Sequence, residues 1–552
     1  MPTIDLTNLT QPLFASPAGV ADFANYVNHS STFYSYLSTD GNLVTLLGSG
    51  FTVNGSNIPT GGAVTEVRMD LGNNNPVTPD MIVTGLTFAA MDLSYASGEA
   101  ASYIFWTLMN QGDTEVLTPS DSVRLIGDSH DWNTGSLLGS DDILRGGDFT
   151  GTRLWGDVFD VTGGTVVGGD DSILGAFTEG HGDFGNITNA WVSGGDDLIR
   201  ATQDVTNASI VTIGDGGFIE SSVVVAGDDV IDLSAVSTVR GFLYGDIVDS
   251  TDFLNTGTSS FLIAGNDLIT GTNTLVGDQI YGDGRIIYSG TYLAGDDTIF
   301  GGGGDDTISG DFGSVAAPAS VTYGHDFIRG GTGNDSILGN GGNDSLYGDA
   351  GFDFLDGGDG DDYLNGGDQA DNLLGGTGND TMFGGAGFDR LFGQQGDDVL
   401  YGGDTFDSLY GQEDNDRLFG QNGNDGMWGG QGNDFLDGGA DNDRMIGGAG
   451  FDTLLGSTGN DTMIGAFNAD TFIFTDFGGG FGNDIIQDFA ATNDLERIDL
   501  SRVAGIADFN DLVANHMNQI GSDVVIDDGS GNTITLQNVQ LADLLDGNDF
   551  IF

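Results

Sequence analysis

A nine-residue repeat runs without interruption from Gly330 to Ile473 and fills sixteen consecutive units. The first units read GGTGNDSIL, GNGGNDSLY and GDAGFDFLD, and one further copy stands upstream at Gly301–Ser309. Position one is Gly and position six is Asp in all sixteen units, while position eight is always apolar. A unit this short cannot bury an apolar face alone, so the units must stack on one another.

Each unit combines one apolar side chain with a glycine-rich segment. We predict a strand of three residues around position eight and a tight turn of six residues, in which glycine permits positive φ. Two units per coil would give two parallel sheets, with the position-eight side chains between them as the core. The pattern therefore predicts an all-β solenoid for residues 330–473.

Stacking also brings the position-six Asp residues into columns. Carboxylates a few ångströms apart repel one another and need a counter-charge. Asp and turn carbonyl oxygens are hard ligands that suit Ca²⁺, whereas Mg²⁺ demands a smaller octahedral cage and keeps its waters. We therefore predict several Ca²⁺ ions, roughly a dozen or more. The predicted ligands are Asp306, Asp335, Asp344, Asp353, Asp362, Asp371, Asp380, Asp389, Asp398, Asp407, Asp416, Asp425, Asp434, Asp443, Asp452, Asp461 and Asp470.

The run GGxGxDxUx resembles the RTX (repeats-in-toxin) calcium-binding family. The resemblance implies a right-handed parallel β-roll whose turns bind Ca²⁺ between successive coils. It also implies that position six supplies side-chain oxygens and that the turn backbone supplies carbonyls. Five units lack the position-four Gly, and their turns are expected to bind Ca²⁺ weakly or not at all. These five residues are Gln369, Thr405, Asp414, Asp441 and Asn468.

The chain before the repeat divides into two regions. Residues 119–329 carry acidic pairs ahead of apolar residues, with second acids such as Asp171, Asp197 and Asp229 spaced 26 to 38 residues apart. We interpret this region as an irregular wide-coil solenoid with loops inserted on one side, and an unrelated β-sandwich is the alternative. Residues 1–118 have little charge and no such repeat, which predicts a small mixed domain of unknown role.

Residues 474–552 are predicted to cap the solenoid, since a repeat array needs a terminal element over its last coil. The pattern indicates a helix from Ile506 to Ile520 and a hairpin over Val524–Leu536. This region resembles the C-terminal part of serralysin-type secreted proteases. Its last residues, Asn548–Phe552, are similar to the uncleaved type I secretion signal of such proteins.

Charge and composition exclude several functions. The chain has 83 acidic and 13 basic residues, a net charge of −70. Such a chain does not bind nucleic acid through its phosphates and is repelled by anionic membranes. It has no Cys, and all its basic residues are Arg. Met1–Val20 lacks the pattern of a secretory signal peptide, and we expect no membrane-spanning stretch.

Catalytic motifs are missing from the sequence. The five His residues are scattered, and neither HExxH nor GxSxG is present, so we predict that the protein is not an enzyme. The expected function is that of a secreted, extracellular calcium-binding protein with a structural, surface-layer or adhesive role. A secreted hydrolase or polysaccharide-active enzyme and a soluble calcium-dependent binding module are the alternatives. Expected partners are the type I secretion apparatus and either a second copy or a cell-surface polysaccharide.

Aromatic residues at position five form a further pattern. Phe352, Phe388 and Phe406 fall in odd-numbered units and therefore on one edge of a two-unit coil, whereas Phe451 falls on the other. An exposed aromatic row would suit a lateral contact. Packing of the rings over the turn is the alternative.

Overall fold

The computed structural model describes residues 170–552 apart from short segments, and before residue 170 it describes only the strands between residues 26 and 167. The excepted segments are residues 176–178, 183, 202–209, 215, 221–222, 237–239, 251–259, 288–289, 316–319, 477–479, 492–494 and 546. Strands dominate the described chain, which confirms the all-β class. The chain divides into two compact units, Met1–Gly324 and His325–Phe552.

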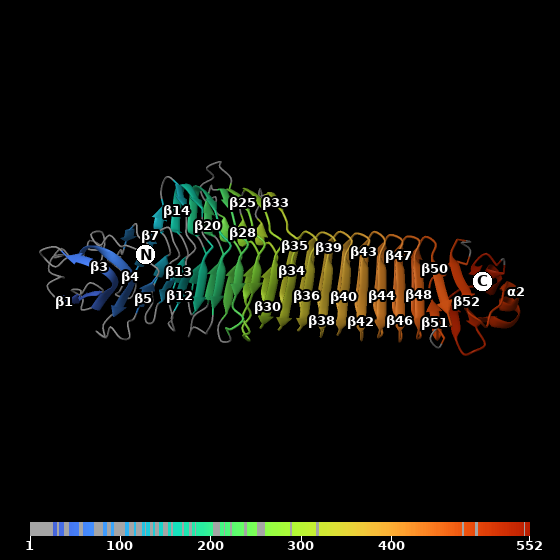
Figure 1. Ribbon diagram of the computed structural model, residues 1–552. Helices are drawn as coiled ribbons and strands as arrows, with labels where there is room; N and C mark the ends of the chain where they lie inside the picture. Colours follow the sequence, from blue (N-terminus) through green and yellow to red (C-terminus); the bar gives the residue numbers. More distant parts are fainter. Residues whose placement is uncertain are drawn as a thin grey trace. The chain divides into compact units, whose positions relative to one another are not determined.

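The second unit is a stack of two-strand coils, which appear as successive rungs in Figure 1. Its strands alternate between two parallel sheets, and each repeat strand pairs with the strand eighteen residues later, so the predicted parallel β-roll is confirmed. The first sheet contains β34(Phe327–Thr332), β36(Ser345–Ala350), β38(Tyr363–Asp368), β40(Thr381–Ala386), β42(Val399–Asp404), β44(Arg417–Asn422), β46(Phe435–Ala440), β48(Thr453–Thr458), β50(Thr471–Thr475) and β52(Arg497–Arg502). The second sheet contains β35(Ser336–Gly341), β37(Phe354–Asp359), β39(Asn372–Thr377), β41(Arg390–Gln395), β43(Ser408–Glu413), β45(Gly426–Gln431), β47(Arg444–Ala449), β49(Thr462–Phe467) and β51(Asn483–Ile486).

The repeat strands are longer than the sequence predicts. β37 runs over positions seven to nine of one unit and positions one to three of the next, so the expectation of a three-residue strand is wrong. The strand continues because Gly at position one has no side chain to collide with the neighbouring coil. A Cβ added to Gly357 would lie 2.6 Å from the carbonyl oxygen of Gly375.

The position-eight side chains form the core of the roll. From Ile337 to Met463 each of them is fully buried, one column on each sheet. A buried aliphatic side chain contributes about 1.5–3 kcal/mol relative to an exposed one. Each coil supplies only two such side chains, so no coil is stable without its neighbours.

The first unit has wider coils, because each coil adds strands of a third parallel sheet. The loops expected on one side of these coils are therefore strands over much of their length. One sheet contains β8(Glu115–Leu117), β12(Ile143–Gly146), β15(Ser172–Gly175), β18(Leu198–Ala201), β22(Val230–Asp232), β26(Leu268–Thr270) and β30(Thr298–Gly303). A second contains β7(Phe105–Met109), β9(Arg124–Ile126), β13(Arg153–Trp155), β16(Glu179–His181), β19(Ile210–Ile213), β23(Gly241–Tyr244), β27(Gln279–Tyr281) and β31(Thr307–Ser309). The third contains β10(Ser129–Trp132), β11(Ser136–Leu138), β14(Val158–Val167), β17(Phe184–Ser193), β20(Gly216–Glu220), β21(Val223–Val225), β24(Ile247–Ser250), β25(Ser260–Ile263), β28(Gly284–Ile287), β29(Gly290–Leu293), β32(Phe312–Val315) and β33(Ser320–Thr322).

Antiparallel strands precede the wide coils. They are β1(Tyr26–His29), β2(Phe33–Leu37), β3(Leu43–Val53), β4(Pro59–Asp70), β5(Met81–Thr84) and β6(Ala90–Asp92). β5 pairs with β8, which in turn pairs in parallel with β12. The antiparallel strands of the predicted 1–118 domain thus lead directly into the first coil sheet, and the predicted domain boundaries stay predictions.

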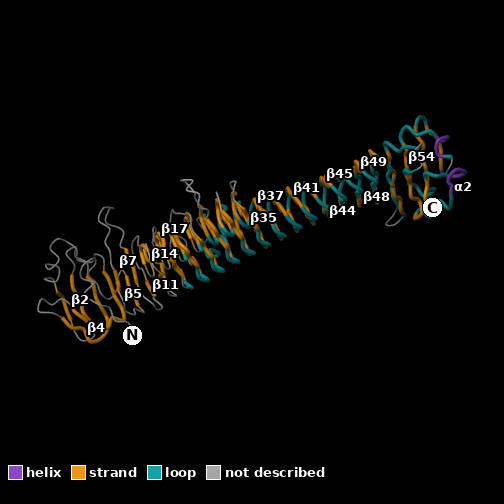
Figure 2. Tube along the Cα trace, turned by 90° about the horizontal axis from the view of Figure 1, so that it is seen from above, coloured by secondary structure: helices purple, strands orange, loops and turns teal. Residues whose placement is uncertain are grey.

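The C-terminal cap covers the last coil of the roll. Its elements are α2(Phe509–Asp511), the π-helical turn η2(Leu512–His516), β53(Met517–Ile520), β54(Asp523–Asp527), β55(Thr533–Leu536), η3(Leu541–Leu544) and β56(Phe550–Ile551). The helix is shorter than predicted because Met517–Ile520 pairs with β54, and the hairpin is confirmed. β55 adds to β51 and β56 adds to β52, and Figure 2 shows the helical turns at this end of the unit. Among the described residues, no helix is long and apolar enough to cross a bilayer.

Candidate metal centre

Buried carboxylates form a ladder along each edge of the roll. The backbone N–H of a position-six Asp donates to Oδ1 of the Asp one coil later, at 2.8 Å from Asp353 to Asp371 and from Asp362 to Asp380. The first edge holds the ladder that includes Asp335, and the second edge the one that includes Asp344. All sixteen position-six Asp residues lie in these two ladders and are at most 3% exposed.

The second oxygen of each carboxylate has a different environment. From Asp362 to Asp461, every position-six Oδ2 is buried and has no hydrogen-bond partner. This oxygen points toward the position-one Gly of its own unit: a Cβ added to Gly357 would lie 2.3 Å from Oδ2 of Asp362. Since the carbonyl oxygen of Gly375 also approaches this point, carboxylate and carbonyl oxygens converge where position one lacks a side chain.

This donor set fits Ca²⁺. A hard cation with six to eight oxygen ligands accepts carboxylates and backbone carbonyls together, without nitrogen or sulfur. Position-six Asp residues of successive coils and the position-one carbonyls between them would hold the ion. A bound ion would supply the positive charge that the paired carboxylates lack.

Burial changes the acidity of these carboxyl groups. It raises the pKa of Asp362 to about 6, of Asp371 to about 8 and of Asp443 to about 9. The backbone N–H of the preceding Asp opposes this shift, while neighbouring carboxylates add to it. The metal-free roll therefore resists ionisation of the groups that would bind the cation.

The turns without Gly at position four differ in backbone from the glycine turns, in which Gly396 has a φ of 127° and Gly360 a φ of 144°. Gln369, Thr405, Asp414, Asp441 and Asn468 have φ between 71° and 82°, within the left-handed region that glycine enters without strain. Asn and Asp tolerate this conformation better than most residues. The replacement thus changes φ at position four by several tens of degrees, and weak binding at these turns stays a prediction.

Two Asp residues outside the sixteen consecutive repeats also belong to these ladders. Asp326 donates its N–H to Asp344 Oδ1 at 2.7 Å, and Asp461 donates to Asp484 Oδ1 at 2.8 Å. Asp484 is fully buried, and burial raises its pKa to about 8. The signal was present, because residues 479–487 read GGFGNDIIQ. Five inserted residues, 474–478, separate this seventeenth copy from the uninterrupted run.

The wide coils carry ladders of the same kind. Asp171, Asp197, Asp229, Asp267 and Asp297 follow one another through N–H to Oδ1 hydrogen bonds of 2.7–2.8 Å, across spacings of 26 to 38 residues. The predicted ligand Asp306 lies elsewhere, at the turn before β31, where its Oδ1 accepts the N–H of Asp278 at 2.6 Å. The acidic turns therefore stack in register although the coils differ in length.

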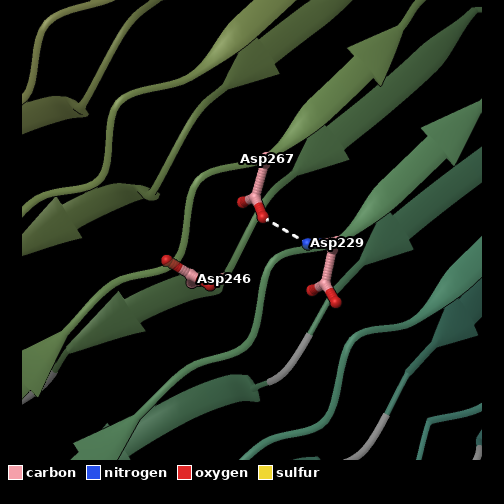
Figure 3. A group of neighbouring side chains, drawn as sticks. All are labelled: Asp229, Asp246 and Asp267. Carbon is pink, nitrogen blue, oxygen red and sulfur yellow. Dashed lines mark hydrogen bonds between the residues drawn. The ribbon is translucent and has the colours of Figure 1, made fainter.

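One group of three carboxylates joins two corners of the wide coils. Oxygen atoms of Asp229, Asp246 and Asp267 lie within 4.8 Å of one another, and all three residues are buried (Figure 3). Asp246 follows β23, whereas the other two precede β22 and β26. Three buried carboxylates this close cannot all be ionised without a compensating charge.

The fold and the turns define a calcium-binding β-roll, and comparison with known proteins agrees. Residues 293–314, 321–355, 338–373, 347–382, 374–409, 401–436 and 437–472 match the family model of the RTX calcium-binding nonapeptide repeat. The chain therefore carries RTX calcium-binding repeats, as the sequence predicts. No curated protein matches the chain. Among solved structures, the extracellular lipase LipA from Serratia marcescens matches with 17% identity and a TM-score of 0.17, over 45% of each chain.

Proposed function

We propose that this protein is a secreted calcium-binding protein with a structural or adhesive role and without catalytic activity. In this proposal calcium acts as the folding switch. The ladders of buried position-six carboxylates carry the argument, because their Oδ2 atoms from Asp362 to Asp461 lack partners. Such a structure is costly to form at neutral pH unless a cation enters the turns.

Secretion in an unfolded state follows from the same chemistry. Extracellular calcium modules bind Ca²⁺ with Kd values of about 10⁻⁴–10⁻³ M, far above cytosolic calcium. Inside a cell the turns would stay empty, and a net charge of −70 would keep the chain expanded. An expanded chain can pass a type I secretion apparatus, and extracellular Ca²⁺ would then fold it.

The absence of catalytic activity rests on the sequence. HExxH and GxSxG motifs are both missing, and the seven Glu residues form no evident acid and base pair. A regular stack of coils supports a role in spacing or attachment, in which repeated surfaces are useful.

A calcium titration tests this function. The full chain, transferred from EGTA to about 10 mM CaCl₂, is followed by circular dichroism and light scattering together. We expect a cooperative gain of β-structure and a compact particle, whereas MgCl₂ should produce little change. An identical β-signal in EGTA and CaCl₂ would refute the folding switch. Growth to large ordered particles would favour a surface-layer role, and a folded monomer would favour an adhesive one.

A further inference from the structure

Position five of the repeat, which the motif leaves variable, has a structural role of its own. On the second edge, Asn or Asp at this position accepts the backbone N–H of the position-five residue one coil later. Asn343 accepts from Asp361 at 3.0 Å, and Asn379 accepts from Asp397 at 2.9 Å. On the first edge Asn424 accepts from Asn442 at 3.0 Å in the same way. Asn and Asp are therefore the residues that suit this position.

Four consecutive coils of the first edge break this rule. Their position-five residues are Phe352, Ala370, Phe388 and Phe406, whose side chains cannot accept a hydrogen bond. The three phenylalanines are 59%, 66% and 50% exposed, so they do not pack over the turn. Exposed aromatic residues that replace a favourable hydrogen-bond acceptor indicate a surface selected for contact. We call these four residues the apolar stripe.

Carboxylates flank the apolar stripe. Asp368 and Asp404 stand at position three of two of these coils and are exposed. A second copy would bring the same carboxylates against each other, within a chain of net charge −70, and like charges oppose such a contact. A partner with apolar and cationic groups side by side is complementary to both features.

The spacing of the stripe matches one face of a helix. Phe352 and Phe406 are three coils apart, about 14 Å at the strand spacing of parallel sheets. An α-helix covers this distance in about ten residues, with side chains at i, i+3, i+7 and i+10 on one face. We propose that the apolar stripe binds a basic amphipathic helix, whose apolar face covers the phenylalanines and whose cationic groups reach Asp368 and Asp404. This site rests on the proposed calcium-folded roll.

The test measures binding of a labelled peptide to the calcium-loaded full chain. The probe is a synthetic peptide of about eighteen residues with Leu on one helical face and Lys on the other, followed by fluorescence anisotropy at about 0.15 M NaCl. Replacing Phe352, Phe388 and Phe406 together by Asn should weaken binding about tenfold or more. Asn restores the acceptor found elsewhere at position five, so this variant should fold. Phe388→Asn alone should show a smaller loss in the same direction.

Phe451→Asn is the matched control. Phe451 occupies position five of the second edge as a single aromatic residue, 62% exposed, and its replacement should leave the affinity unchanged. Equal affinity of the triple variant, or equal binding of a scrambled peptide of the same composition, would overturn the proposal. Loss of self-association instead of peptide binding would assign the stripe to a second copy and also overturn it. A calcium titration of each variant by circular dichroism separates these outcomes from failure of the calcium-dependent fold.

Discussion

At the scale of single residues, position six carries the chemistry and position five does not. Asp361 and Asp362 are adjacent, yet Asp361 is exposed and Asp362 is buried with its Oδ2 unpartnered. Replacing Asp362 by Asn should lower the number of bound Ca²⁺ ions by about one or two, because neighbouring turns share position-six ligands. Isothermal titration calorimetry of the full chain measures this number.

Asp361→Asn is the control for that experiment. It removes the same formal charge one residue away and retains an oxygen that can accept the N–H of Asn379. The calcium stoichiometry should therefore stay at the wild-type value. If both variants lost the same number of ions, overall charge rather than the buried ladder would determine binding.

The raised pKa values of the ladder carboxyl groups predict that the metal-free roll becomes less stable as the pH rises. Burial raises the pKa of position-six carboxyl groups from 3.8 to between about 6 for Asp362 and about 9 for Asp443. The folded state then holds protons that the unfolded chain releases, so stability is lost as pH rises through these values. In EGTA, circular dichroism should show more β-structure at about pH 5 than at about pH 8. Saturating Ca²⁺ should abolish this difference, and a metal-free β-signal that grows with pH would contradict it.

At the scale of the strand, alternation between inward and outward side chains determines stability. In β43, Leu409 is fully buried and Ser408 is half-buried. Leu409→Ala should lower the free energy of unfolding by about 2–5 kcal/mol, since it opens a cavity in the core column. Urea unfolding in saturating CaCl₂ measures the change. Ser408→Ala should alter it by less than about 0.5 kcal/mol, and equal effects would mean that the strand faces are assigned wrongly.

At the scale of the whole molecule, the cap determines whether the last coil is covered. β55 and β56 pair with β51 and β52, the last strands of the two sheets. Deleting residues 503–552 would leave both strands with open edges and would expose the apolar residues beneath them. We expect the calcium midpoint of folding to rise by several fold and the folded chain to associate. Circular dichroism and light scattering against CaCl₂ measure both, and an unchanged midpoint would show that the cap does not stabilise the roll.

Much of this architecture follows from the repeat alone. A nine-residue period with one apolar position requires stacking, and stacking puts Asp335 and its equivalents into columns, whatever the details of the turn. The length of the strands was harder to predict, because a Gly at position one is typical of a turn when only the sequence is considered. In the roll its lack of a side chain lets the strand continue beside the next coil.

The tertiary structure alone decided which distant residues meet. The wide coils vary from 26 to 38 residues and therefore have no fixed period in the sequence. The proximity of Asp246 to Asp229 and Asp267 could not be predicted from the sequence for this reason. Likewise, five inserted residues place Asp484 out of phase with the nine-residue period, and its membership of the ladder is evident only from its hydrogen bond with Asp461. The fold of the nine-residue repeat can be predicted from the sequence because every unit makes the same local interactions with its neighbours. The grouping of carboxylates across coils depends on how loops of unequal length are accommodated, and only stacking in three dimensions determines that.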